Sequence, residues 1–281
     1  MERAAPKFGV FRLWRRSNVR SVAPRPLFGL RTWIVLAVAS AALGLAFVYV
    51  DPFAVAWQRR LPQWLKLPFH YLDYFGWSGT ILWPVGVAIL LLFSLERFDL
   101  TRRTRAAIAV LQLRLVLVFL AVGAPGLAVS ILKRVIGRLR PGAFDSQGHL
   151  AFDPAAWTPA AASFPSGHAT TAFAAAIVLA ALWPRARVPL LILAALAALA
   201  RIVLDAHYTS DAIGGAIFGS LGAILIVRAF ARRRLTLKIT ADGIIRPMPG
   251  PSMRRIVALF VSIGGAVARS RASKSAADGR I

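Results

Sequence analysis

The chain has 281 residues, 58% of them hydrophobic, and its 35 Lys and Arg against 11 Asp and Glu give a formal net charge of +24. The apolar share exceeds the ~45–50% of an ordinary soluble domain and excludes an intrinsically disordered chain. The absence of cysteine excludes a disulfide scaffold and a Cys-ligated zinc site. A charge this high is typical of nucleic-acid-binding proteins, so its position relative to the apolar residues decides its meaning.

Six apolar segments approach the ~20 residues that are needed to cross a bilayer. They cover about residues 32–50, 79–95, 106–132, 169–183, 188–204 and 212–227. The first follows a basic stretch and is too long for the apolar core of a secretory signal, so we expect a retained helix. The fourth is the shortest and could extend back through Ser166. Four glycines in the sixth predict close helix contacts: Gly214, Gly215, Gly219 and Gly222.

The basic residues concentrate in alternate connections between these segments. Residues 1–31, 96–105, 184–187 and 228–281 hold 26 of the 35 Lys and Arg. The positive-inside rule places these four segments in the cytoplasm. We therefore expect an all-α, polytopic membrane protein, a six-transmembrane-helix bundle with both termini cytoplasmic.

Three regions follow from this topology. They are a basic cytoplasmic segment at 1–31, the membrane domain at 32–230 and a basic cytoplasmic tail at 231–281. We expect the basic termini to bind anionic membrane lipids. No nucleic-acid partner is expected, because no aromatic residues are interleaved with the charge, and nothing in the sequence indicates an obligate protein partner.

The tail and one charge inside the third segment need separate interpretations. Alternating apolar residues at 235–239 before Asp242-Gly243 predict a short strand and turn. Residues 256–268 are apolar but too short to span, which favours an interfacial helix. Arg114 either marks a misplaced helix boundary or reaches the cytoplasmic surface from the first turns of its helix.

Three short polar segments fall at helix ends that the alternation assigns to the external side. They are residues 133–141 after the third helix, 164–168 before the fourth and 200–211 between the fifth and sixth. We therefore expect them to converge on one face of the membrane.

The positive residues of these segments predict a phosphate site. Lys133 and Arg140 are seven residues apart, or two helical turns, so both can face one way. With Arg201 they form a cluster whose members would repel one another unless an anion is bound, and arginine matches the oxygens of phosphate. Ser166 and Gly167 open the fourth helix, where free backbone N–H groups favour an anion and glycine permits its close approach.

Two histidines complete a set of groups for phosphoryl transfer. His207 precedes Asp211 by four residues, and a carboxylate on Nδ1 would leave Nε2 free as a nucleophile. His168 lies in the first turn of the fourth helix, where it can protonate a leaving oxygen. The cations take the place of a metal, so the sequence predicts neither a metal nor a cofactor.

The motifs Lys-x6-Arg-Pro, Pro-Ser-Gly-His and Arg-x5-His-x3-Asp resemble the three signatures of the type 2 phosphatidic acid phosphatases. These are membrane lipid phosphate phosphatases related to vanadium-dependent haloperoxidases. The resemblance implies that His207 is the nucleophile, Asp211 its partner and His168 the general acid. It assigns phosphate binding, without a metal, to Lys133, Arg140, Ser166, Gly167 and Arg201.

Two features near the third motif modify this expectation. It begins Ala200-Arg201 where the family usually has Ser-Arg, so one hydroxyl is missing, which we expect to tune activity. Asp205 would compete with substrate if it paired with Arg201.

Four other polar residues are interpreted as solvated loop residues, namely His70, Asp145, His149 and Asp153. Aromatic residues such as Tyr74 and Trp77 are expected in an interfacial belt.

The sequence thus predicts an integral membrane phosphatase, in a bacterial inner membrane, that hydrolyses a lipid phosphate or lipid pyrophosphate at the external, periplasmic leaflet through a phosphohistidine. Candidate substrates are polyprenyl pyrophosphate, phosphatidate, phosphatidylglycerol phosphate and a lipid A-type glycolipid. The alternatives are a phosphotransferase that passes the phosphate to another acceptor, a haloperoxidase that holds vanadate, and a non-catalytic transporter or scaffold for anionic lipids.

Overall fold

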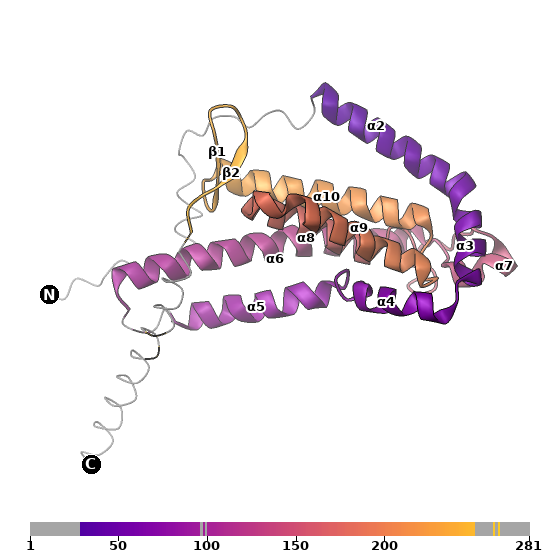
Figure 1. The fold of residues 1–281 in the computed structure, drawn as a ribbon, viewed down its shortest axis with the longest axis horizontal. Coiled ribbons are helices and arrows are strands. Elements are labelled where there is room, and N and C mark those ends of the chain that lie inside the picture. The colour runs from indigo at the N-terminus through magenta and orange to yellow at the C-terminus, as the bar shows by residue number, and fades with distance from the viewer. Residues whose placement is uncertain (1–28, 96–97, 99, 251–260, 262–263, 265–281) are drawn as a thin grey trace, which may run out of the picture.

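A computed structural model describes residues 29–95, 98, 100–250, 261 and 264, and these form a long helical bundle (Figure 1). Its α-helices are α2 (Leu30–Leu45), α3 (Asp51–Arg60), α4 (Gln63–Asp73), α5 (Ser78–Ser94), α6 (Arg102–Ile136), α7 (Phe144–Gln147), α8 (Gly167–Leu182), α9 (Arg187–Val203) and α10 (Thr209–Arg232). A π-helical turn (Ala46–Val50) joins α2 to α3, and short 3-10 turns occur at Pro141–Ala143 and Pro184–Ala186.

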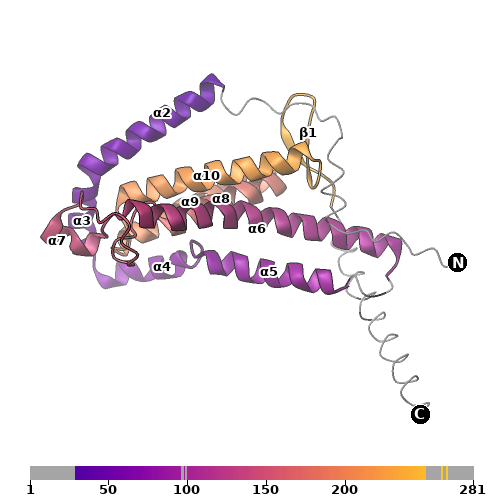
Figure 2. The ribbon, with the colours of Figure 1, turned by 180° about the vertical axis from the view of Figure 1, so that it is seen from behind.

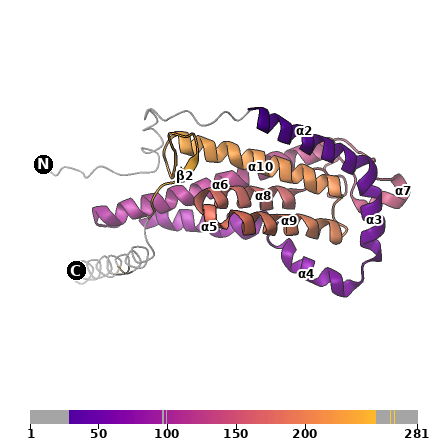
Figure 3. The same ribbon diagram turned by 45° about the horizontal axis from the view of Figure 1, so that its top comes forward.

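Helix α8 lies at the centre of the bundle. It packs against α6, α9 and α10, while α5 covers α6 and α4 lies along α9. Figure 3 shows α8 between α6 and α9, with α10 running over them. Its buried positions are mainly Ala and Thr, so the neighbouring helices can approach it closely.

Five stretches are long and apolar enough to cross a membrane. They are Thr32–Arg60, Gln63–Ser94, Arg102–Ile136, Pro184–Val203 and Thr209–Arg232. Helix α8 has 16 residues, about 24 Å, which is shorter than the ~30 Å hydrocarbon core. The prediction of six spanning helices therefore holds by length for five of them, and α8 is an apolar helix enclosed by the others.

Residues 51–78, between the first two predicted spans, are largely helical. The first predicted span continues through Asp51 to Arg60, and α4 follows after a break at Leu61–Pro62. Asp51 is completely buried, so the charge that marked the end of the apolar run instead lies inside the protein. Helix α2 diverges from α10 toward its own N-terminal end (Figures 1 and 2).

The glycines of α10 make the close contacts that were predicted. A Cβ added at Gly215 would lie 2.4 Å from the Ser166 carbonyl oxygen, and one at Gly219 would lie 2.2 Å from the Thr170 carbonyl oxygen. The backbones of α10 and α8 therefore touch where α8 begins, which fixes the start of α8 relative to α10.

The predicted strand and turn are confirmed. Strands β1 (Leu237–Ile239) and β2 (Ile245–Pro247) pair antiparallel and lie against the end of α10. Helix α6 runs unbroken past Arg114, whose Nη2 donates to the carbonyl oxygen of Met248 at 2.8 Å. Arg114 therefore marks no helix boundary and holds the end of the hairpin. The interfacial helix predicted at 256–268 lies outside the described residues, apart from the single positions 261 and 264.

Replacing Gly219 by Ala tests the contact between α8 and α10. The added methyl group would overlap the backbone of Thr170, and overpacking of this kind typically destabilises by about 1–3 kcal/mol. We expect a lower thermal unfolding temperature in detergent micelles. Gly126→Ala is the matched control, because a Cβ at this helical glycine meets nothing within 4 Å. Equal unfolding temperatures for the two variants would contradict the packing described.

Candidate active site

The three polar segments gather at one end of the bundle. This end contains the last turn of α6, the first turns of α8 and α10, and the last turn of α9, together with α3, α4 and α7 (Figures 1 and 2). The hairpin and the turn at Pro184–Ala186 lie at the opposite end. The convergence expected from alternation is therefore confirmed as a spatial fact.

Lys133 and Arg140 reach this end by a different route from the one expected. Helix α6 ends at Ile136, and Gly137 follows with φ of 67°, so the two residues do not share a helix face. A Cβ at Gly137 would lie 1.8 Å from the Asp153 carbonyl oxygen, so this position requires glycine. Arg140 lies instead in an extended segment, where its N–H donates to Ala160.

His207 and Asp211 form a buried pair at the start of α10. Nδ1 of His207 lies 3.4 Å from Oδ2 of Asp211, and both side chains are almost fully buried. The same oxygen accepts the N–H of Tyr208 at 3.0 Å and the hydroxyl of Ser163 at 2.5 Å. Asp211 thus caps the helix and orients the histidine, which leaves Nε2 of His207 for other chemistry.

The surroundings of His207 keep its ring neutral. Burial lowers the pKa of His207, and the hydrogen bond and charge of Asp211 oppose this effect. The positive charges of Arg140 and Arg201 lower the pKa further. A neutral imidazole at ordinary pH retains the lone pair that a nucleophile needs.

A buried arginine that the sequence interpretation passed over holds Asp211 in place. Nη1 of Arg138 donates to Oδ1 of Asp211 at 2.6 Å and to Oγ of Ser210 at 2.6 Å. Nη2 donates to Oδ2 of Asp51 at 2.8 Å. Ser210 closes the network by donating its N–H and its hydroxyl to Asp51. The side chains of Arg138, Asp51 and Asp211 are all fully buried.

Two aromatic rings contact this arginine. Its Cζ lies 4.2 Å from the ring centroid of Phe47 and 4.2 Å from that of Tyr208, distances typical of cation–π contacts. The sequence did carry a signal for Arg138, because segment 133–141 holds four basic residues and only two of them were assigned to the phosphate site. It carried none for its partner Asp51, which is 87 residues away.

The three predicted phosphate-binding cations lie within electrostatic reach of one another. Lys133 feels the charges of Arg140 and Arg201, and burial together with Arg201 lowers the pKa of Arg140. Nε of Arg140 and Nε of Arg201 are buried without a hydrogen-bond partner. No described residue gives Lys133 or Arg140 an ion pair, so both remain available to an anion.

Ser166 and Gly167 open α8 as predicted. Ser166 is the N-cap and is fully buried, with its Oγ 3.5 Å from the N–H of Ala169. Its own N–H donates to the Asp211 carbonyl oxygen at 3.0 Å, which ties α8 to α10. An anion at this helix start would therefore meet the N–H groups of Gly167 and His168, which the first helical turn leaves unpaired.

Arg201 has a partner that the sequence interpretation missed. Nη1 of Arg201 lies 2.8 Å and 2.7 Å from the two carboxylate oxygens of Asp73. Nε2 of His168 lies 3.7 Å from Oδ2 of the same residue. Asp205, the expected competitor, instead accepts a hydrogen bond from Gln58 and lies 4.0 Å from Arg59.

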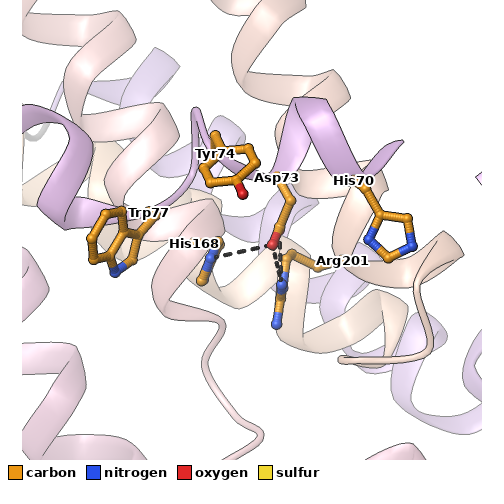
Figure 4. Close-up of a pocket in the computed structure, with 6 residues that line it drawn as sticks. All are labelled: His70, Asp73, Tyr74, Trp77, His168 and Arg201. Carbon is orange, nitrogen blue, oxygen red and sulfur yellow. Dashed lines mark hydrogen bonds and ion pairs between the residues drawn. The ribbon is translucent and has the colours of Figure 1, made fainter. Parts of the chain in front are cut away.

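Asp73, His168 and Arg201 border an open cavity of about 380 Å³, shown in Figure 4. Its lining residues are His70, Asp73, Tyr74, Trp77, His168 and Arg201. His70 therefore lies on α4 beside the cavity rather than in a loop. Asp145 is also not in a loop, since it lies on α7 and pairs with Arg59 at 2.8 Å.

Comparison with known proteins gives a consistent set of matches. The PAP2 superfamily profile matches residues 114–235. A lipid A 1-phosphatase of Rhizobium johnstonii is 34% identical over 83% of this chain and 92% of its own length. A lipid A 4'-phosphatase of Bacteroides thetaiotaomicron is 28% identical over 64% of this chain and 77% of its own length. A solved PAP2-type phosphatidylglycerolphosphate phosphatase from Bacillus subtilis aligns with a TM-score of 0.45 at 22% identity, over 69% of this chain and 90% of that one.

Replacing Arg138 by Gln tests the buried network. The change leaves Asp51 and Asp211 buried without their cation, and removal of one partner from a buried ion pair typically costs about 3–5 kcal/mol. We expect a large fall in thermal unfolding temperature. Arg134→Gln is the control, because this nearby arginine is only half-buried and contacts the ring of Trp157. Equal losses of stability in the two variants would argue against a special role for Arg138.

Proposed function

This chain belongs to the PAP2 superfamily and is a multi-pass membrane lipid phosphatase. On that premise we propose that it hydrolyses the phosphate monoester of a lipid A-type glycolipid at the external leaflet, through a phosphohistidine on His207 and without a metal. The observation that carries the mechanism is the buried His207–Asp211 pair, which lies within reach of Arg140 and Arg201.

In the first step the phosphate binds among Lys133, Arg140 and Arg201. Nε2 of His207 attacks phosphorus as the bond from phosphorus to the lipid oxygen breaks. Burial and the charge of Arg201 lower the pKa of His168 to about 4 in the free site, and the negative charge of the bound phosphate opposes both effects. His168 then gives its proton to that oxygen, so the lipid leaves as a neutral alcohol. Asp211 stabilises the positive charge that develops on the imidazole, and the cations stabilise the phosphoryl oxygens.

In the second step water replaces the histidine. His168, now neutral, takes a proton from a water molecule as the water oxygen attacks phosphorus. The bond from phosphorus to Nε2 breaks, inorganic phosphate leaves, and His207 returns to its neutral form. The positive charge that a metal would supply comes from side chains that are already in place.

Two observations support the choice of substrate. The site lies at the ends of membrane helices, which suits a headgroup whose acyl chains stay in the bilayer. The Rhizobium johnstonii relative, which this chain matches over most of its length, acts on lipid A by its name. The external placement is supported by the basic residues in the connections at the opposite end of the bundle.

Phosphate release from a panel of lipid phosphates tests this function. The panel contains lipid A, phosphatidate, phosphatidylglycerol phosphate and undecaprenyl pyrophosphate, each with a metal chelator present. We expect lipid A to be preferred, His207→Ala to lower kcat by at least about 10³-fold and His168→Ala by about 10²–10⁴-fold. His70→Ala, at the rim of the same cavity, is the control for general damage. Full activity of His207→Ala would overturn the mechanism, and loss of activity in chelator would overturn metal independence.

Labelling of single cysteines tests the external placement, because the chain has no cysteine of its own. Ser146 is exposed on α7 at the site end, and Ala241 is exposed in the hairpin turn at the other end. We expect an impermeant thiol reagent to label Ser146→Cys, but not Ala241→Cys, in intact spheroplasts. The reverse pattern would place the active site in the cytoplasm.

A further inference from the structure

Asp73 is an acidic residue in a site otherwise built to bind an anion. Both of its carboxylate oxygens contact Nη1 of Arg201, and Oδ2 also lies 3.7 Å from Nε2 of His168. A phosphate monoester bound for hydrolysis would place its oxygens on Arg201 and its leaving oxygen near His168. The carboxylate therefore occupies part of the space that the proposed function assigns to substrate.

The local structure holds Asp73 at this point. Asp73 is the last residue of α4, which lies along α9, the helix that carries Arg201. Its carbonyl oxygen accepts the N–H of Gly76 at 3.0 Å. A Cβ at Gly76 would lie 2.9 Å from Cβ of His168, so the turn after α4 touches the start of α8. The position of the carboxylate thus follows from the packing of α4 along α9 and of the turn after α4 against the start of α8.

The contact between Asp73 and Arg201 is partly exposed to solvent. The side chain of Asp73 is 24% exposed and that of Arg201 is 12% exposed, so both border the open cavity (Figure 4). Any anionic headgroup at this membrane surface can reach the pair. Most headgroups of that kind are phosphodiesters with a single negative charge, whereas a phosphate monoester carries about −1.5 to −2 at pH 7.

We propose that Asp73 is a specificity-determining residue that occupies Arg201 until a phosphate monoester displaces it. A phosphodiester carries the same charge as the carboxylate and gains little by exchange with it. A monoester carries more charge, and Coulomb attraction to the cluster grows in proportion. Lys133 and Arg140 have no ion-pair partner among the described residues, so they add to this preference. This proposal rests on the proposed function, because it describes how the same site would select phosphate monoesters over phosphodiesters.

Binding of inorganic phosphate to the full-length protein in detergent micelles tests the proposal without turnover. The variants are Asp73→Asn and Asp73→Ala. The matched control is Asp145→Asn, because both carboxylate oxygens of Asp145 also accept hydrogen bonds from one arginine, Arg59. We expect both Asp73 variants to bind phosphate at least about five-fold more tightly than wild type, the ratio that corresponds to ~1 kcal/mol. Asp145→Asn should bind as wild type does.

The same titration with phosphatidylglycerol in the micelles tests the selection against phosphodiesters. We expect phosphatidylglycerol to raise the apparent Kd for phosphate in the Asp73 variants and to leave that of wild type nearly unchanged. Equal phosphate affinity in wild type and folded Asp73 variants, or equal competition by phosphatidylglycerol, would overturn the proposal. Absence of lipid phosphate hydrolysis by a wild type that shows the expected binding would overturn the proposed function and leave this inference standing.

Discussion

One buried cation, Arg138, organises the end of the bundle on which the site depends. It bridges Asp51 at the start of α3 and Asp211 at the start of α10, and both carboxylates are fully buried. Each buried carboxylate depends on this cation, because desolvation of an unpaired charge costs several kcal/mol. Since Asp211 contacts His207, the position of the proposed nucleophile is linked through Arg138 to the first candidate membrane span. The buried ion pair with Arg138 and the contact with His207 therefore share a single carboxylate.

Close backbone packing supplies the second constraint. Gly215 and Gly219 let α10 touch the start of α8, and the N–H of Ser166 is bonded to the Asp211 carbonyl oxygen. His168 and His207 begin or precede these two helices, so their separation is set by main-chain contacts rather than by flexible side chains. Rigid placement of this kind is what the proposed transfer at a single phosphorus atom would require.

The sequence predicted the helices and the motifs well but missed the partners of the motif residues. Apolar runs and alternating charge were enough to place the spans and to bring the three motifs to one face. Asp51 was missed because a single carboxylate next to an apolar run looks like the end of a span, and Asp73 because it lies in the segment between the first two predicted spans. Their importance arises only from contacts with Arg138 and Arg201, 87 and 128 residues away. Arg140 lies at the same end of the bundle as the other motif residues, but not on the helix face that was expected, since Gly137 ends the helix that was thought to carry it.

Two of the three arginines in the first motif show why local charge counts are a poor guide to a site. Arg138 and Arg140 lie two residues apart in one extended segment, yet Arg138 is neutralised by two carboxylates while Arg140 keeps a buried Nε without a partner. Only the second contributes attraction for an anion. Arg201 is intermediate, because Asp73 pairs with it at the edge of the cavity. On the proposed function, the affinity of the site for phosphate therefore depends on which cations already have an internal anion, so a change at one carboxylate should alter it as well as a change at an arginine.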